Sequence, residues 1–64
     1  MTAGEKIKVI RTFRGWSQRL LADKSGIHRN TIQAYEAGKV EPSYINYETL
    51  MDTMGVEIIL RRKK

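Results

Sequence analysis

Four side chains near the start of a short predicted helix have the chemistry needed to read DNA bases. Arg29, Asn30 and Gln33 carry polar side chains, and Ala34 is small and apolar. In a helix over about residues 29–37, these four would project from one face near the N-terminus. Polar and small side chains presented in this way suit contacts with base edges in the major groove of duplex DNA.

A second short helix and a tight turn are predicted to hold this helix in place. Ser17 is a good N-cap for the preceding helix, and Gly26 supplies the positive φ that a sharp turn requires. Ala22 lets two helices that cross steeply beside the turn approach closely, and Ile32 would pack the second helix on the first. Residues 17–38 therefore predict two short helices joined by a tight turn.

The remaining residues predict two further helices and a strand. Apolar residues at helical spacing indicate helices over about 4–14 and from about Pro42 to Met54. After Gly55 the pattern changes to an alternating one, which predicts a short β-strand over about 56–61, with a fifth helix as the alternative. The expected fold is one all-α domain over residues 1–64, with four helices and this short strand. The apolar face of the strand would be Val56, Ile58 and Leu60.

Charge is distributed unevenly along the chain. Twelve Lys and Arg against seven Asp and Glu give a net charge of +5. Residues 1–39 carry a net +5, residues 40–57 carry −4, and residues 61–64 carry +4. This separation predicts one surface for a polyanion and another turned away from it.

Composition excludes several classes of site. The absence of cysteine removes disulfides and thiolate metal sites, and a single histidine cannot build a metal site alone. No Ser–His–Asp set and no Gly-rich phosphate loop can be assembled, and no apolar run approaches the ~20 residues of a membrane span. We therefore expect a soluble, cytoplasmic protein that is not an enzyme, needs no cofactor or metal and has no membrane partner.

These features together resemble the helix-turn-helix family of phage repressors and Cro proteins. The matching stretches, which span Ile7 to Val56, are IRTFRGWSQRLLA, SGIHRNTIQAYEAG and the KVEPS loop before a helix that ends in MGV. The resemblance implies a repressor-like domain that binds double-stranded DNA. The chain departs from the family at His28, where Ser or Thr is the favoured N-cap, and at Ser25, which replaces a commonly apolar residue. Its apolar C-terminal strand is a third departure.

The resemblance also implies roles for individual residues. Arg29, Asn30, Gln33 and Ala34 occupy the base-reading positions. Arg11 and Glu36 match an ion pair that ties the first helix to the end of the third. The residues expected at the DNA backbone are Ser17, Gln18, His28, Thr31, Lys39 and Ser43.

The function expected from these observations is sequence-specific regulation of transcription. A homodimeric repressor would bind a palindromic operator whose half-sites lie ~34 Å apart, one turn of the duplex. The C-terminal strands of two copies would pair across the two-fold axis. The residues expected at this dimer interface are Leu50, Met54, Val56, Ile58 and Leu60. The alternative is an antitoxin or adaptor that mainly binds a partner protein such as a toxin, with regulation of its own promoter as a secondary role.

Overall fold

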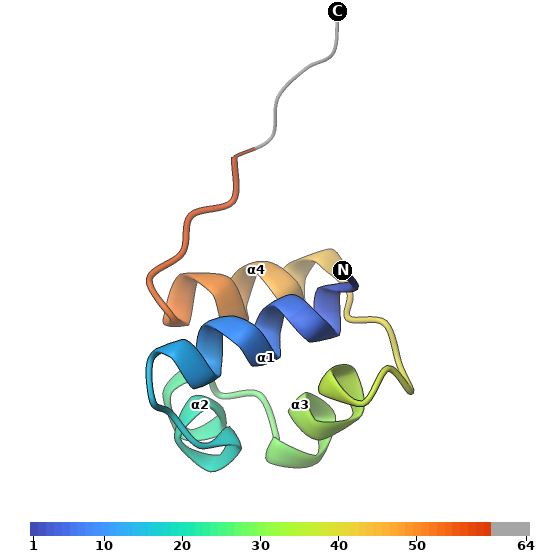
Figure 1. Cartoon of the computed structure of the whole chain (residues 1–64), viewed down its shortest axis with the longest axis horizontal. Coiled ribbons are helices and arrows are strands. Elements are labelled where there is room, and N and C mark those ends of the chain that lie inside the picture. Colours follow the sequence, from blue (N-terminus) through green and yellow to red (C-terminus); the bar gives the residue numbers. More distant parts are fainter. Residues whose placement is uncertain (60–64) are drawn as a thin grey trace, which may run out of the picture.

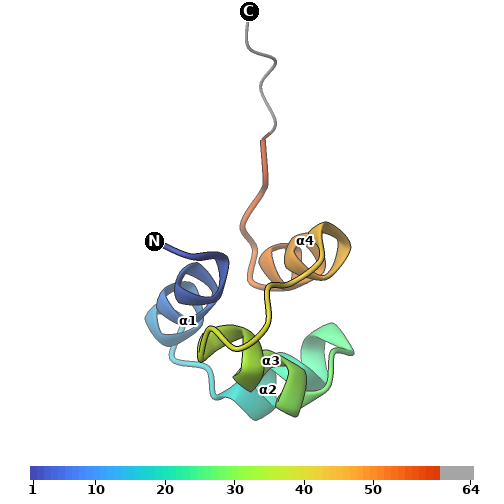
Figure 2. The ribbon, with the colours of Figure 1, turned by 90° about the vertical axis from the view of Figure 1, so that its right-hand side faces the viewer.

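Four α-helices in two layers make up the fold. The computed structural model describes residues 1–59. The helices α1 and α4 lie side by side in one layer, and α2 and α3 form the other (Figures 1 and 2). Their bounds are Ala3–Phe13 for α1, Gln18–Ser25 for α2, Arg29–Glu36 for α3 and Tyr44–Thr53 for α4. The expected four-helix, all-α architecture is therefore confirmed.

Local sequence signals define where the helices begin and end. Thr2 caps α1 in a capping box: its hydroxyl accepts from the Glu5 N–H at 3.1 Å, and the Glu5 carboxylate accepts from the Thr2 N–H at 2.7 Å. Hydrogen bonding by Thr2, first from its backbone N–H and then from its side chain, lowers the pKa of the Glu5 carboxyl. At the end of α2, Gly26 adopts the left-handed conformation with φ of 79°, as its place in the turn predicts.

All four helices contribute to a single core. The buried side chains include Ile32, as expected, and also Leu50 and Met54, whose exposed fractions are 0% and 1%. Those last two were expected at a dimer interface, but inside the core they are not available to a second copy. The complete set is Ile7, Leu21, Ile32, Tyr35, Leu50, Met51 and Met54.

The predicted C-terminal strand is not formed by the residues that the structure describes. Residues 56–59 form neither a strand nor a fifth helix, and Leu60 and the rest of the expected strand lie outside the described residues. A strand exists only with a ladder partner, and four helices offer none. The predicted alternation nevertheless persists, because Val56 and Ile58 pack against the core while Glu57 and Ile59 are exposed.

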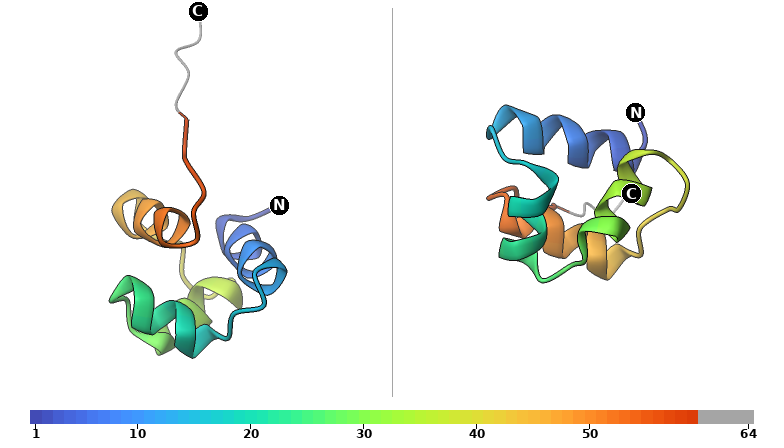
Figure 3. Two further views of the ribbon diagram at one scale, coloured as in Figure 1. Left: turned by 90° about the vertical axis from the view of Figure 1, so that its left-hand side faces the viewer. Right: turned by 90° about the horizontal axis from the view of Figure 1, so that it is seen from below.

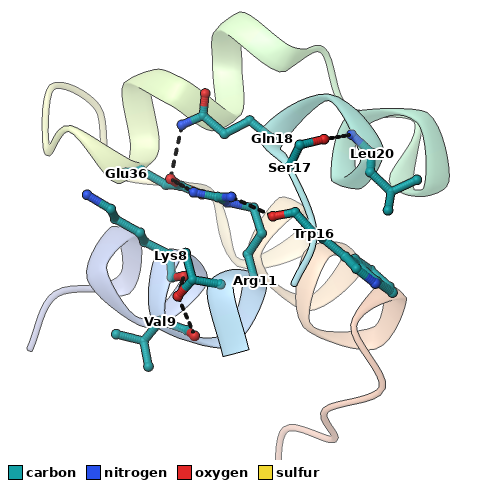
Figure 4. Close-up of polar contacts among 9 residues, drawn as sticks. Lys8, Val9, Arg11, Trp16, Ser17, Gln18, Leu20 and Glu36 are labelled. Atoms are coloured by element: carbon teal, nitrogen blue, oxygen red, sulfur yellow. Dashed lines mark hydrogen bonds and ion pairs between the residues drawn. The ribbon is translucent and has the colours of Figure 1, made fainter. Parts of the chain in front are cut away.

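An ion-pair network joins three of the helices. The guanidinium of Arg11 in α1 donates from Nε to Glu36 Oε2 at 2.7 Å and from Nη2 to Oε1 at 2.9 Å (Figure 4). Its third nitrogen, Nη1, donates to the Trp16 carbonyl at 2.7 Å, and Gln18 at the start of α2 donates to Glu36 Oε1 at 3.0 Å. The expected pair of Arg11 and Glu36 is therefore present, and its side chains are only 10% and 4% exposed. It fixes the end of α3 against α1 and α2.

A glycine lets α1 approach the same end of α3. Gly4 is buried, and a Cβ atom built there would overlap the Tyr35 carbonyl oxygen and lie 2.7 Å from its carbonyl carbon. Because these neighbours are backbone atoms, they cannot rotate away as a side chain would. The helical backbone at Gly4 needs no positive φ, so glycine is required here for space alone.

We predict that Gly4→Ala destabilises the domain. Alanine gains ~1 kcal/mol of helix propensity over glycine, but the overlap with α3 would cost more than that gain, on the order of 1–3 kcal/mol net. Urea unfolding followed by circular dichroism measures the difference. Lys8→Ala, at an exposed position of the same helix, is the control and should stay within ~0.5 kcal/mol of the parent. A Gly4→Ala chain as stable as the parent would refute the close approach.

Candidate nucleic-acid interface

Side chains of the turn between α2 and α3 accept hydrogen bonds from its backbone N–H groups. His28 is the N-cap of α3, and its Nδ1 accepts from the Asn30 N–H at 3.0 Å. The histidine thus performs the capping role for which the family favours Ser or Thr. The Ser25 hydroxyl accepts from the Ile27 N–H at 3.1 Å, so this polar residue stabilises the turn directly. The start of α3 is therefore capped and hydrogen-bonded despite both departures.

The two faces of α3 have different roles. Ile32 and Tyr35 face the core with exposed fractions of 0% and 5%. The opposite face presents Arg29, Asn30 and Gln33, all of which are exposed. No helix of the described chain crosses the lower side of α2 and α3, as the side view and the view from below show (Figures 1 and 3). Three polar side chains expected to read bases thus share one open face, whereas Ala34, the fourth, is half-buried.

Several side chains expected at the DNA backbone are already engaged within the chain. Ser17 caps α2 by accepting from the Leu20 N–H at 3.0 Å, and Ser43 caps α4 by accepting from the Asn46 N–H at 3.1 Å. The amide of Gln18 donates to Glu36. The structure leaves Lys39 exposed and Thr31 half-buried. The structure therefore places Ser17, Gln18 and Ser43 in roles that shape the fold.

A hollow beside the N-terminus of α3 reveals a residue that sequence reasoning missed. It has a volume of about 480 Å³ and brings Arg19 of α2 next to His28 and Arg29. The available signal was an arginine in the first turn of the helix that precedes the tight turn. The full lining is Arg19, Ala22, Asp23, Gly26, Ile27, His28 and Arg29.

Charge distinguishes the α2–α3 layer from α4, although α1, which lies beside α4, carries the exposed cations Lys6 and Lys8. The α2–α3 layer exposes Arg19, Lys24 and Arg29 against one carboxylate, Asp23. The segment with four acidic residues and no base follows α3 and includes α4, which lies in the other layer (Figure 1). A polyanion would therefore be attracted to the layer that carries α3 and repelled from α4. None of the helices among residues 1–59 is long and apolar enough to cross a membrane.

Comparisons with known proteins agree with this geometry. The helix-turn-helix family model matches residues 7–60. A curated relative, the SPbeta prophage-derived uncharacterized HTH-type transcriptional regulator YonR of Bacillus subtilis (strain 168), is 42% identical over 53 residues. The match covers 83% of this chain but 49% of that protein, so the chain spans about half the length of its relative. No solved structure matches the chain significantly. Because the family model covers most of the residues and includes the whole α2–α3 unit, the chain belongs to the helix-turn-helix family.

Proposed function

We propose that this chain is a sequence-specific, double-stranded DNA-binding regulator of transcription and not an enzyme. The observation that carries the proposal is the exposed face of α3, where Arg29, Asn30 and Gln33 stand together while the opposite face is locked into the core. Family membership supports the same function. A rigid helix with polar side chains near its N-terminus is the arrangement with which helix-turn-helix proteins enter the major groove.

In this proposal, side chains of α3 read the DNA sequence, and cations on neighbouring elements position the helix on the duplex. Arg29, Asn30 and Gln33 hydrogen-bond to base edges, which differ from one base pair to the next in the major groove. Half-buried Ala34 contributes at most an apolar contact with a base. Exposed cations on neighbouring elements, including Lys39, meet phosphates and set the register of the helix on the duplex.

We further propose that two copies bind a palindromic operator and repress transcription by blocking polymerase. Two features support the dimer: the exposed apolar side chain of Ile59, and the peptide groups of residues 57–59, which form no backbone hydrogen bond with partners among residues 1–59. If the segments of two copies paired antiparallel across a two-fold axis, each would supply hydrogen-bond partners for the peptide groups of the other. Ile59 is 67% exposed and would contribute apolar area to such an interface.

A protein-binding role through α4 is the second candidate. A hollow of about 400 Å³ lies between α4 and the segment that follows it, with Asp52, Glu57 and Ile58 in its lining. Ile45, at the start of α4, is 72% exposed. An antitoxin or adaptor would use this face for a partner protein and could still bind DNA through α3, because the two surfaces belong to different layers.

We predict that Arg29→Ala and Gln33→Ala each lose discrimination between base pairs. Removing a side chain that reads a base should cost about 1–3 kcal/mol on a duplex selected from a random pool and much less on unrelated DNA. Fluorescence anisotropy with both duplexes measures the two affinities. Lys39→Ala, the comparison variant, removes an exposed cation proposed to meet phosphate and should weaken binding to both duplexes alike. Equal losses on both duplexes for Arg29→Ala would remove it from the reading set, and a parent chain that binds no duplex at low salt would refute the proposed function.

Deletion of residues 56–64 is predicted to convert the dimer into monomers. The deletion removes both the unpaired peptide groups and the apolar side chains proposed to join the two copies, so light scattering should give the mass of one chain. Ile59→Pro provides a milder test, because it removes one ladder donor at an exposed position and leaves the core side chains in place. A truncated chain that stays dimeric would place the interface elsewhere.

A further inference from the structure

Two apolar side chains lie on the face of α1 that points away from the core. Phe13 is 88% exposed and Val9 is 52% exposed. They are four residues apart, so they are neighbours on the same face of the helix. The core side of α1 carries Ile7 and Arg11 instead, and both of these are buried. The described part of the chain therefore leaves Val9 and Phe13, which form the α1 apolar face, open to solvent.

The α1 apolar face lies beside the place where the C-terminal segment, residues 56–59, leaves the helices. Figure 4 shows Val9 on the side of α1 away from α2 and α3, the side toward which the chain after α4 leads. The side chain of Arg14, the residue after Phe13, reaches the start of that segment: a Cβ atom built at Gly55 would lie 2.8 Å from its Nη2 atom. The α1 apolar face and the C-terminal segment are thus neighbouring parts of one surface.

The proposed dimer needs more apolar area than the C-terminal segment supplies. An isolated two-stranded ribbon is marginally stable in water, and a specific protein interface buries roughly 1,000 Å² or more. Within residues 56–59, Val56 and Ile58 pack on the core of their own chain, which leaves Ile59 as the exposed apolar side chain. An aromatic side chain buries about 150–250 Å², so Phe13 of each copy would supply much of the missing area.

We propose that the α1 apolar face packs against the same face of a second copy of this chain. A two-fold axis perpendicular to α1 sets the two helices antiparallel, so Phe13 of each copy lies near Val9 of the other. The inference rests on the proposed homodimer and adds a helical contact beside the paired C-terminal segments. Neither contact alone supplies enough area for a stable dimer. Because α2 and α3 lie on the other side of α1, both copies of α3 stay open to DNA (Figure 2).

Phe13→Gln removes the proposed contact and leaves the core in place. The circular dichroism spectrum should not change, because Phe13 is exposed in the single chain. Each dimer loses two buried aromatic rings, so the dissociation constant from sedimentation equilibrium should rise about 100-fold. Phe13→Leu keeps an apolar side chain and should raise this constant less than about tenfold. Ile45→Gln is the matched control, because it removes a similarly exposed apolar side chain from α4 and should leave the constant unchanged.

The absence of cysteine from the chain allows the contact to be located directly. Thr12→Cys places a single thiol at an exposed position between Val9 and Phe13 in the sequence. In the antiparallel arrangement these thiols of the two copies lie close to the two-fold axis, so a short bismaleimide should join them into a covalent dimer. Ile45→Cys, treated in the same way, should stay uncrosslinked.

Three results would overturn the inference. A Phe13→Gln chain that dimerises as tightly as the parent would leave the C-terminal segments as the dimer contact. Crosslinking of Ile45→Cys in place of Thr12→Cys would put the second copy against α4. A parent chain that is monomeric at every concentration would overturn the inference together with the proposed homodimer. Binding of duplex DNA by that single chain would still leave the proposed regulator standing, so the two failures can be told apart.

Discussion

The buried carboxylate of Glu36 is the constraint on which the arrangement of the helices depends. It is 4% exposed and receives three hydrogen bonds, two from Arg11 and one from Gln18. A buried charge left unpaired is strongly destabilising, so α1 and the start of α2 must stay where their donors reach this carboxylate. Glu36 is the last residue of α3, so its ion pair with Arg11 fixes the C-terminal end of this helix. The proposed reading residues begin at the opposite, N-terminal end. Gly4 allows α1 to come close enough for this contact.

The remaining contacts of α3 leave it little freedom. At its start, the left-handed Gly26 and the His28 cap define the direction in which the helix leaves the turn. In its middle, Ile32 is fully buried. Near its end, the Tyr35 hydroxyl accepts a hydrogen bond from the Asn46 amide of α4 at 2.8 Å. A helix held in this way can present side chains to DNA without first losing conformational freedom, which lowers the entropic cost of binding.

Features of the fold that depend on neighbouring residues in the sequence could be predicted from it. Features that depend on contacts between distant residues could not. Capping residues and the glycine at the turn determine helix ends within a few residues of themselves, so the four helices and the α2–α3 turn were predicted. Gly4 was not, because its importance arises from the backbone of α3, about thirty residues away in the chain. Leu50 and Met54 were assigned to a dimer because apolar spacing on a helix does not say whether its own core or a second copy covers it. The alternation at residues 56–59 was predicted correctly, but a strand also needs a partner, which no pattern within one chain supplies.

The central claim, that α3 enters the major groove, is tested most directly by guanine-N7 methylation interference on a duplex selected from a random pool. The N7 atom of guanine lies in the major groove, so a methyl group there blocks a helix that reads this groove and leaves minor-groove binders unaffected. We predict interference at guanines in two clusters, one helical turn apart on the same face of the duplex. Tight binding without interference at any guanine of the selected site would contradict this account.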